Sequence, residues 1–212
     1  MRLLCLDSST AALTVALVED GLTLAAVDLE VGVRHGELLA PALRDVLATA
    51  PGRPDAVAVG LGPGPFTSLR VGIATAAALA DASGVPAYGA CSLDLLAAPD
   101  VLVAQDARRK EVYWARYDAV GARVEGPAVE SRESLAARLP AQATVLGAGA
   151  ELLGLAAPTG ELVWPKAERL WALVLPAIEG GRPVAPLTPL YLRRPDAREA
   201  VRRDATPAAS LP

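Results

Sequence analysis

Residues 3–27, LLCLDSSTAALTVALVEDGLTLAAV, contain three apolar runs in close succession and set the plan of the fold. The first run ends at Asp7-Ser8-Ser9-Thr10. The second run, residues 13–18, is followed by Asp20-Gly21, which is a strong hairpin signal, and the third run covers residues 22–27. Three strands joined by tight turns predict an antiparallel meander.

After the meander, the apolar period changes to that of a helix. Residues 34–50 carry an apolar face at helical spacing, formed by Leu38, Leu39, Ala42, Leu43, Val46 and Leu47. An apolar strand at 56–61 then runs into Gly62-Pro63-Gly64-Pro65, and a second helix is predicted at 67–83. A short strand at 85–88 and a helical turn at 92–97 complete this half of the chain.

The same order of elements returns in the second half. The elements predicted there are strands at 101–104, 111–117 and 124–129, a helix at 131–139 with Ser131 as N-cap, a strand at 144–146 and a helix at 168–178. We therefore predict an α/β fold of two lobes with the same plan, packed side by side. The first lobe covers residues 1–100 and a smaller second lobe covers residues 101–190. A C-terminal extension of low order, residues 191–212, is expected to pack back on the first lobe.

The composition narrows the possible function classes. The chain has 20 Lys and Arg against 24 Asp and Glu, a formal net charge of −4, and 4% aromatic residues. It therefore lacks the basic footprint and the stacking residues of a protein that grips nucleic acid over its whole surface. Two cysteines and one histidine are too few for a disulfide scaffold or a histidine-rich metal centre. We predict that no metal is bound.

The sequence predicts neither a secretion signal nor a membrane span. Asp7 interrupts the apolar start of the chain, where a secretory segment would continue. No apolar run reaches the roughly 18–20 residues that a membrane span needs. We expect a cytoplasmic protein with reduced thiols and no membrane contact.

Polar residues follow several predicted strands, where an open α/β sheet places its ligands. Asp7, Gly62, Asp106 and Gly147 hold such positions, and we expect them to converge on one cleft between the lobes. An acid followed by hydroxyls can hold a metal–phosphate group, or the same residues can form a simple turn, which is the interpretation we favour. The candidate nucleotide- or anion-binding residues of this cleft are Asp7, Ser8, Ser9, Thr10, Gly62, Gly64 and Asp106.

The glycine-rich loop at 62–65 aims backbone N–H groups at the start of the following helix, an arrangement that suits anions. It is not a Walker A loop, because the Lys-Ser/Thr ending is missing. The alternative is a rigid turn with Thr67 as N-cap. Arg70 lies in the first helical turn, where the helix dipole disfavours a cation, so a carboxylate or phosphate partner is expected for it.

The helices at 34–50 and 67–83 are candidates for a subunit interface, because one is rich in Leu and the other in small residues. They would supply half of a four-helix bundle with a like or related subunit. The residues proposed for this interface are His35, Leu38, Leu39, Ala42, Arg70, Ala74, Ala76 and Ala77. The alternative is packing within the chain, and His35 by itself is typical of a structural residue at a helix start.

The chain resembles the bacterial TsaB (YeaZ) family along nearly its whole length. The matching segments are LCLDSSTAALTVAL, RHGELLAPAL, GPGPFTSLRVGIATAAALA, QDARRKEVYWARYD and PLYLR. Pro65 and Ser68 replace a Ser and a Gly of the usual glycine-rich motif. The resemblance implies duplicated ribonuclease-H-like lobes of the actin/Hsp70/sugar-kinase (ASKHA) superfamily. It also implies a role in making N6-threonylcarbamoyladenosine (t6A) in tRNA, and pairing through the first-lobe helices.

Partners follow from the same resemblance. They are a TsaD-like catalytic subunit, a TsaE-like ATPase, a second copy of the chain when it is isolated, and tRNA through the complex only. ATP or ADP with Mg²⁺ would belong to the complex. The catalytic paralogue has two metal-binding histidines four residues apart, and the matching positions here are Cys91 and Leu95. The resemblance therefore implies a non-catalytic subunit, with no catalytic residue of its own.

Two other classes remain as alternatives. An ATPase or small-molecule kinase of the same fold would need a second acid in the cleft, and Asp106 is the candidate. A peptidase would need a nucleophile and base pair, for which His35 is the one histidine and no Gly-x-Ser-x-Gly motif is present.

Overall fold

The computed structural model describes residues 1–140, 142–155 and 163–193. Its first lobe contains β1 (Arg2–Asp7), β2 (Ala12–Glu19), β3 (Leu22–Glu30), α1 (His35–Thr49), β4 (Ala56–Gly60), α2 (Phe66–Ser83), β5 (Ala87–Ala90) and the 3₁₀ turn η1 (Ser92–Leu96). The five strands form one sheet in the order β3-β2-β1-β4-β5, in which β1 pairs antiparallel with β2 and parallel with β4. The predicted meander and both predicted helices are confirmed.

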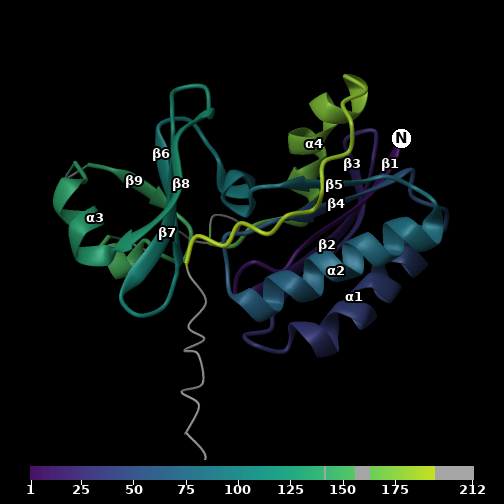
Figure 1. Ribbon diagram of the computed structural model, residues 1–212, viewed down its shortest axis with the longest axis horizontal. Helices are drawn as coiled ribbons and strands as arrows, with labels where there is room; N and C mark the ends of the chain where they lie inside the picture. The colour runs from purple at the N-terminus through teal and green to yellow at the C-terminus, as the bar shows by residue number, and fades with distance from the viewer. Residues whose placement is uncertain (141, 156–162, 194–212) are drawn as a thin grey trace, which may run out of the picture.

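As far as its residues are described, the second lobe repeats this topology with one strand fewer. It contains β6 (Val101–Asp106), β7 (Glu111–Tyr117), β8 (Arg123–Ser131), α3 (Arg132–Arg138), β9 (Thr144–Leu146) and the 3₁₀ turn η2 (Glu151–Leu153). Its sheet has the order β8-β7-β6-β9, so β6 stands where β1 stands in the first lobe. Ser131 caps α3 as predicted, because its side chain accepts a hydrogen bond from the backbone N–H of Ser134. Figure 1 shows the two sheets side by side.

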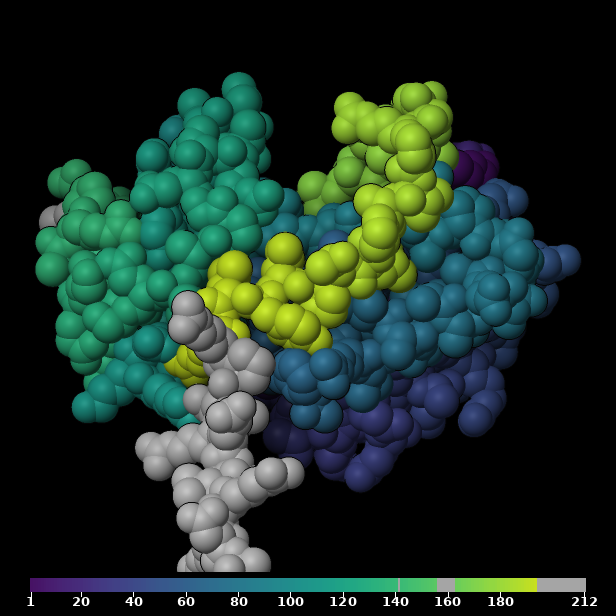
Figure 2. Space-filling view, in the orientation of Figure 1, coloured from purple at the N-terminus to yellow at the C-terminus, as the bar shows by residue number. Residues whose placement is uncertain are grey.

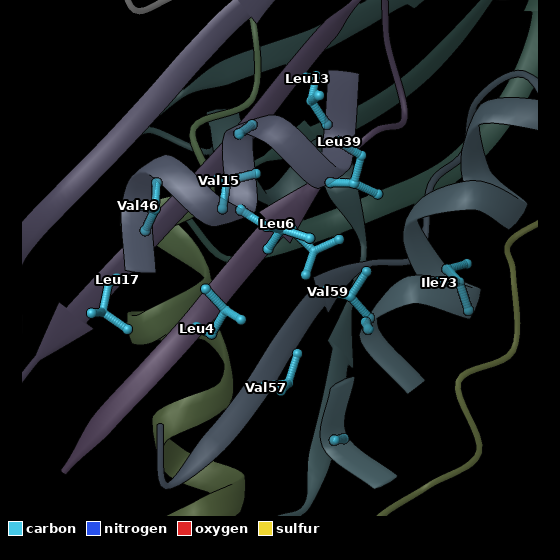
Figure 3. Close-up of a cluster of buried hydrophobic side chains, with 14 of the residues drawn as sticks. Leu4, Leu6, Leu13, Val15, Leu17, Leu39, Val46, Val57, Val59 and Ile73 are labelled. Carbon is cyan, nitrogen blue, oxygen red and sulfur yellow. The ribbon is translucent and has the colours of Figure 1, made fainter. Parts of the chain in front are cut away.

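The first sheet is covered on both faces, which explains why β1 is apolar at nearly every position. Leu4 and Leu6 point into a core shared with α1 and α2, together with residues of β2 and β4 (Figure 3). Leu3 and Cys5 alternate with them and pack on the opposite face. A strand buried on both faces reads as a continuous apolar run rather than an alternating one.

Helix α4 (Leu170–Glu179), preceded by the 3₁₀ turn η4 (Ala167–Arg169), lies on a different lobe from the one expected. The order of elements assigned the helix at 168–178 to the second lobe. In the structure, Leu170 and Val174 pack with Leu3 and Cys5 on the first sheet. One face of the second sheet is covered instead by η1, through Leu93 and Leu96. The chain therefore returns to the first lobe after the second is complete.

The segment after α4 continues along the first lobe. Leu187 packs against the α1–α2 core, and the N–H of Leu190 donates to the carbonyl of Leu61. Figure 1 shows this segment running past α2 toward the second lobe. The low order expected for residues 191–212 concerns positions that, beyond residue 193, lie outside the described residues. In the ranges that are described, none of the helices has the length and apolar character needed to cross a membrane.

Candidate functional site

The turn that joins β1 to β2 is closed by its own side chains. One carboxylate oxygen of Asp7 accepts hydrogen bonds from the backbone N–H of Ser9 at 2.9 Å and from its hydroxyl at 2.7 Å. The other accepts from the hydroxyl of Ser92, at the start of η1. Ser8 donates to the carbonyl of Ser68, and Thr10 bonds the backbone of Ala12. These hydroxyls are therefore occupied within the first lobe, as the turn interpretation expects.

Asp7 is 1% exposed, which makes it a fully buried acid. Burial raises the pKa of Asp7 above its usual range, and the hydrogen bonds from Ser92 and Ser9 offset only part of this effect. Neither Asp7 nor the two glycines of the loop, Gly62 and Gly64, line the pocket between the lobes.

The end of β4 and the glycine-rich loop that follows it pack directly against this turn, and the packing explains their glycines. A Cβ on Gly60 would lie 1.7 Å from a carboxylate oxygen of Asp7, and one on Gly64 would lie 2.1 Å from the carbonyl oxygen of Ser9. The N–H of Gly62 donates to the Ser92 hydroxyl at 3.0 Å, and its carbonyl accepts from the N–H of Ser92. We expected the backbone N–H groups of this loop to face an anion. The N–H of Gly62 instead donates to a side chain of the same lobe.

Helix α2 begins earlier than predicted. Pro65 is its N-cap and Phe66 its first residue, so Thr67 is not the cap. Among the described residues, no carboxylate pairs with Arg70, so the protein itself does not supply the acidic partner that we expected. Its guanidinium lies 3.8 Å from the centre of the Phe66 ring, and its Nε donates to the Tyr191 hydroxyl at 3.1 Å. A cation–π contact and a hydroxyl therefore hold this cation at the helix start.

A pocket of about 230 Å³ lies between the lobes. Ser9, Thr10 and Pro65 line it from the first lobe, and Asp106 and Ala148 line it from the second. Of the four strand-end residues that we expected to converge, Asp106 lines this pocket, whereas Asp7, Gly62 and Gly147 do not. Among the candidate nucleotide- or anion-binding residues, Ser9, Thr10 and Asp106 line it. Residues that line the pocket but were not singled out from the sequence are Gln105, Arg108, Leu152 and Trp164.

Asp106 lies in a turn that is more open than the turn after β1. Its side chain is 39% exposed, accepts a hydrogen bond from the N–H of Arg108 at 2.7 Å and forms an ion pair with the same residue. Arg108, Arg109 and Lys110 all have left-handed backbone conformations, with φ of 63°, 53° and 62°. Three such residues in a row are uncommon for side chains other than glycine.

The predicted interface residues divide into two groups. His35, Leu39, Ala42 and Ala76 are buried within the first lobe, so they support the helices from inside and are not available to a partner. Leu38 is partly buried, whereas Arg70, Ala74 and Ala77 are exposed. Helical spacing explains the division, because residues three or four apart share one face of α2. Figure 2 shows this helix exposed between α1 and the segment that follows α4.

The cysteines have the character of core residues. Burial raises the pKa of the Cys5 thiol far above its usual range and raises the pKa of Cys91 to about 11. A thiol with such a pKa is a poor nucleophile at neutral pH. Leu95, the second position matched to a metal-binding histidine, is also buried. Across the described residues, no cluster of three His, Cys, Asp or Glu side chains could hold a metal ion.

Ser92 is the residue of this site that sequence reasoning missed. It joins three separate segments, since its side chain contacts Asp7 and Gly62 at the beginning of η1. A signal was present in the glycines at 60, 62 and 64, because so many small residues indicate a close approach of backbone. The sequence did not indicate which segment makes that approach.

The duplicated topology and the pocket between the lobes define the class of the protein: it has the ribonuclease-H-like fold of the ASKHA superfamily, with two lobes of one plan. A family model described as TsaD, tRNA N6-adenosine threonylcarbamoyltransferase, matches residues 30–152. The tRNA threonylcarbamoyladenosine biosynthesis protein TsaB of Escherichia coli is 32% identical over 220 residues, covering 91% of this chain and 95% of that protein. The chain belongs to the TsaB/YeaZ family.

Further similarities agree with this assignment. An uncharacterized protein of Mycobacterium tuberculosis is 43% identical over 203 residues, covering 92% of this chain and 93% of that protein. A solved structure of YeaZ from Pseudomonas aeruginosa superposes with a TM-score of 0.74 at 29% identity, covering 90% of this chain and 99% of that one.

Proposed function

We propose that this chain acts in t6A synthesis on tRNA as a non-catalytic subunit that binds and supports a TsaD-like catalytic subunit. The assignment to t6A synthesis is supported by relatives that are named as tRNA threonylcarbamoyladenosine biosynthesis proteins. Cys91 and Leu95 at the two positions matched to metal-binding histidines support the non-catalytic role. The protein would work in the cytoplasm, with a TsaE-like ATPase in the same complex and tRNA bound through the complex.

The observation that carries the partner role is the exposed face of α2. Arg70, Ala74, Ala77, Ala78 and Asp81 are exposed on this helix at helical spacing. Alanines let a second helix approach closely, and the buried face of α2 is anchored in the first-lobe core through Leu69, Ile73 and Ala76. A rigid helix with a small-residue outer face suits the four-helix packing that we propose for both the heterodimer and the homodimer.

The partner role is tested by introducing a single charged residue on the exposed face of α2. We expect Ala77→Glu to weaken binding to the TsaD-like protein of the same organism at least a hundredfold, because a buried unpaired charge costs about 3–5 kcal/mol. Ala137→Glu, at an exposed position of α3 in the second lobe, is the matched control and should bind as wild type does. Ala76 is fully buried, so a charge there would test folding instead.

Binding is measured by co-purification with and without the TsaE-like protein and ATP, and homodimerisation by size exclusion with light scattering. If folded Ala77→Glu protein binds as wild type does, the assigned face is wrong. If wild-type chain does not bind the catalytic subunit under any of these conditions, the partner role itself is wrong. Hydrolysis of Mg-ATP by the purified chain alone would favour the alternative of an ATPase of the ASKHA fold.

A further inference from the structure

The segment after α4 runs from the first lobe to the second, and the proposed partner role gives it no task. Pro183, Pro186 and Pro189 recur in it at every third position. A proline fixes its own φ and restricts the residue before it to extended backbone, so this segment has few conformations to lose on folding. Figures 1 and 2 show it crossing the first lobe and ending beside the second. Its last part, residues 187–193, is called the strap from here on.

The strap contacts the cores of both lobes through two similar turns. The backbone N–H groups of Thr188 and Tyr191 each donate to the carbonyl of the proline two residues earlier, at 2.8 and 3.0 Å. The central residue of each turn is a leucine. Leu187 packs against the core between the first sheet and its helices, whereas Leu190 packs against the core formed by η1 and the second sheet. Two neighbouring turns therefore join two hydrophobic cores.

On the first lobe, the strap is anchored beside the start of α2. The N–H of Leu190 donates to the carbonyl of Leu61 at 2.8 Å. The ring of Tyr191 lies 5.1 Å from the ring of Phe66, and its hydroxyl accepts a hydrogen bond from Nε of Arg70. Aromatic pairs at this separation attract each other beyond the area that they bury. The first anchor therefore combines a backbone bond with a ring contact.

On the second lobe, the strap is anchored by Arg193. Its guanidinium forms an ion pair with Glu111, the first residue of β7, and donates to the carbonyl of Arg108 at 3.4 Å. The side chains of Arg193 and Glu111 are 25% and 37% exposed, so the pair is partly shielded from water. Three residues of chain from Leu190 to Arg193 span at most about 11 Å. The lobes therefore cannot move far apart while both anchors hold.

The two anchors lie beside opposite walls of the inter-lobe pocket. Pro65, which precedes Phe66, lines this pocket from the first lobe, and Arg108 lines it from the second. The pocket measures about 230 Å³, which is below the roughly 300–1,000 Å³ of ordinary ligand sites. A ligand of ordinary size would therefore need the lobes to separate, and the strap opposes that movement.

We propose that the strap holds the two lobes closed over the inter-lobe pocket, and that breaking the ion pair between Arg193 and Glu111 lets them open. The hinge of this movement is η1, which bonds to the first lobe through Ser92 and packs on the second sheet through Leu93. The proposal concerns the isolated chain and does not depend on the partner role.

The test measures the distance between the lobes by double electron–electron resonance on the full-length chain. Spin labels are attached at Ala172→Cys on α4 and Ala137→Cys on α3, because both positions are exposed and lie on different lobes. The natural thiols, Cys5 and Cys91, are buried and have raised pKa values, so the introduced thiols react first. Labelled chain is diluted into unlabelled chain to record distances within one copy. The shorter, closed distance should dominate in wild type.

Glu111→Gln keeps the shape of the side chain and removes its charge. It should raise the ratio of open to closed distances about fivefold, as expected for loss of one partly shielded ion pair. The matched control is Glu133→Gln, which removes the exposed ion pair with Arg132 in the same lobe and should leave the distances unchanged. Arg193→Glu should open the lobes further, and combining it with Glu111→Arg restores an ion pair and should return the closed distance.

Three results would overturn the proposal. Distances that stay closed in both Glu111→Gln and Arg193→Glu would show that the strap does not hold the lobes. Equal opening in Glu133→Gln would show that the place of the lost charge does not matter. If the double variant has the circular dichroism spectrum of wild type and its lobes stay open, contact between residues 111 and 193 is not what closes them.

Discussion

The turn after β1 and the turn after β6 hold the same place in two lobes of one plan, but they are built in opposite ways. In the first, Asp7 is buried and receives three hydrogen bonds, two from Ser9 and one from Ser92. In the second, the side chain of Asp106 is 39% exposed and bonds to Arg108 in the adjacent turn. The glycine-rich loop packs on the first turn, and basic residues in strained backbone form the second.

This difference shows that a repeated topology does not repeat a site. Each acid is the last residue of the first strand of its lobe, yet of the two only Asp106 lines the pocket between the lobes. Asp7 instead accepts a hydrogen bond from Ser92 at the start of η1, and Ser92 in turn bonds Gly62 of the glycine-rich loop. The turn after β1 therefore has a structural role within the first lobe, whereas the turn after β6 is charged, accessible and lines the pocket between the lobes.

The largest expected effect comes from filling the space that Gly60, the last residue of β4, leaves for Asp7. Gly60→Ala places a Cβ 1.7 Å from the Asp7 carboxylate and 2.5 Å from the Ser92 hydroxyl. We expect a loss of about 3 kcal/mol in the free energy of unfolding, at the upper end for overpacking, because the acid and the backbone must both move. The measurement is urea unfolding followed by circular dichroism.

Gly36→Ala is the matched control for this experiment. Its Cβ enters open space in the first turn of α1, so it should be neutral or stabilise by up to about 1 kcal/mol, as alanine does in helices. A Gly60→Ala protein as stable as wild type would show that the turn after β1 is not the tight joint described above.

The second prediction compares one polar partner in each lobe. Ser92→Ala removes a donor from a buried carboxylate and leaves the N–H of Gly62 without its acceptor, so it should cost about 2 kcal/mol. Asp106→Asn changes an exposed side chain and should stay within about 0.5 kcal/mol of wild type. Similar losses for the two variants, measured by urea unfolding, would contradict the contrast between the lobes.

The difference between the turn after β1 and the turn after β6 could not be predicted from the sequence, and the reason is physical. Hydrophobic period and turn residues predicted the strands and helices closely, because each signal is local. The burial of Asp7 depends on Ser92, which is 85 positions away along the chain. The lobe that receives α4 likewise depends on which sheet face remains open, which the order of elements does not reveal. The sequence also did not show which of Ala76 and Ala77 faces outward from α2. The structure shows that Ala76 is buried and Ala77 is exposed.

The third prediction uses pH to detect the buried acid. Because burial raises the pKa of Asp7, its contribution to stability is fully present below the unfolded pKa and is lost as pH rises through the folded value. Wild type should therefore gain stability relative to Asp7→Asn as pH falls from neutral, by about 1.4 kcal/mol for each unit of pKa difference. Urea unfolding of both proteins across that range measures it, and a pH-independent difference would contradict it. Asp106→Asn, in the open turn, is the comparison variant.

The smallest expected effect is relief of backbone strain in the turn after β6. Lys110 has a φ of 62°, and its carbonyl accepts a hydrogen bond from the N–H of Arg132, which holds the backbone in place. A left-handed residue with a Cβ costs about 1–2 kcal/mol, whereas glycine adopts this conformation freely and loses part of the gain to its greater unfolded-state entropy. Lys110→Gly should therefore be about 1 kcal/mol more stable than Lys110→Ala, which removes the same charge and keeps the strain. The two variants are compared by thermal and urea unfolding. Equal stabilities would mean that the turn carries no strain and that its left-handed residues do not set it apart from the turn after β1.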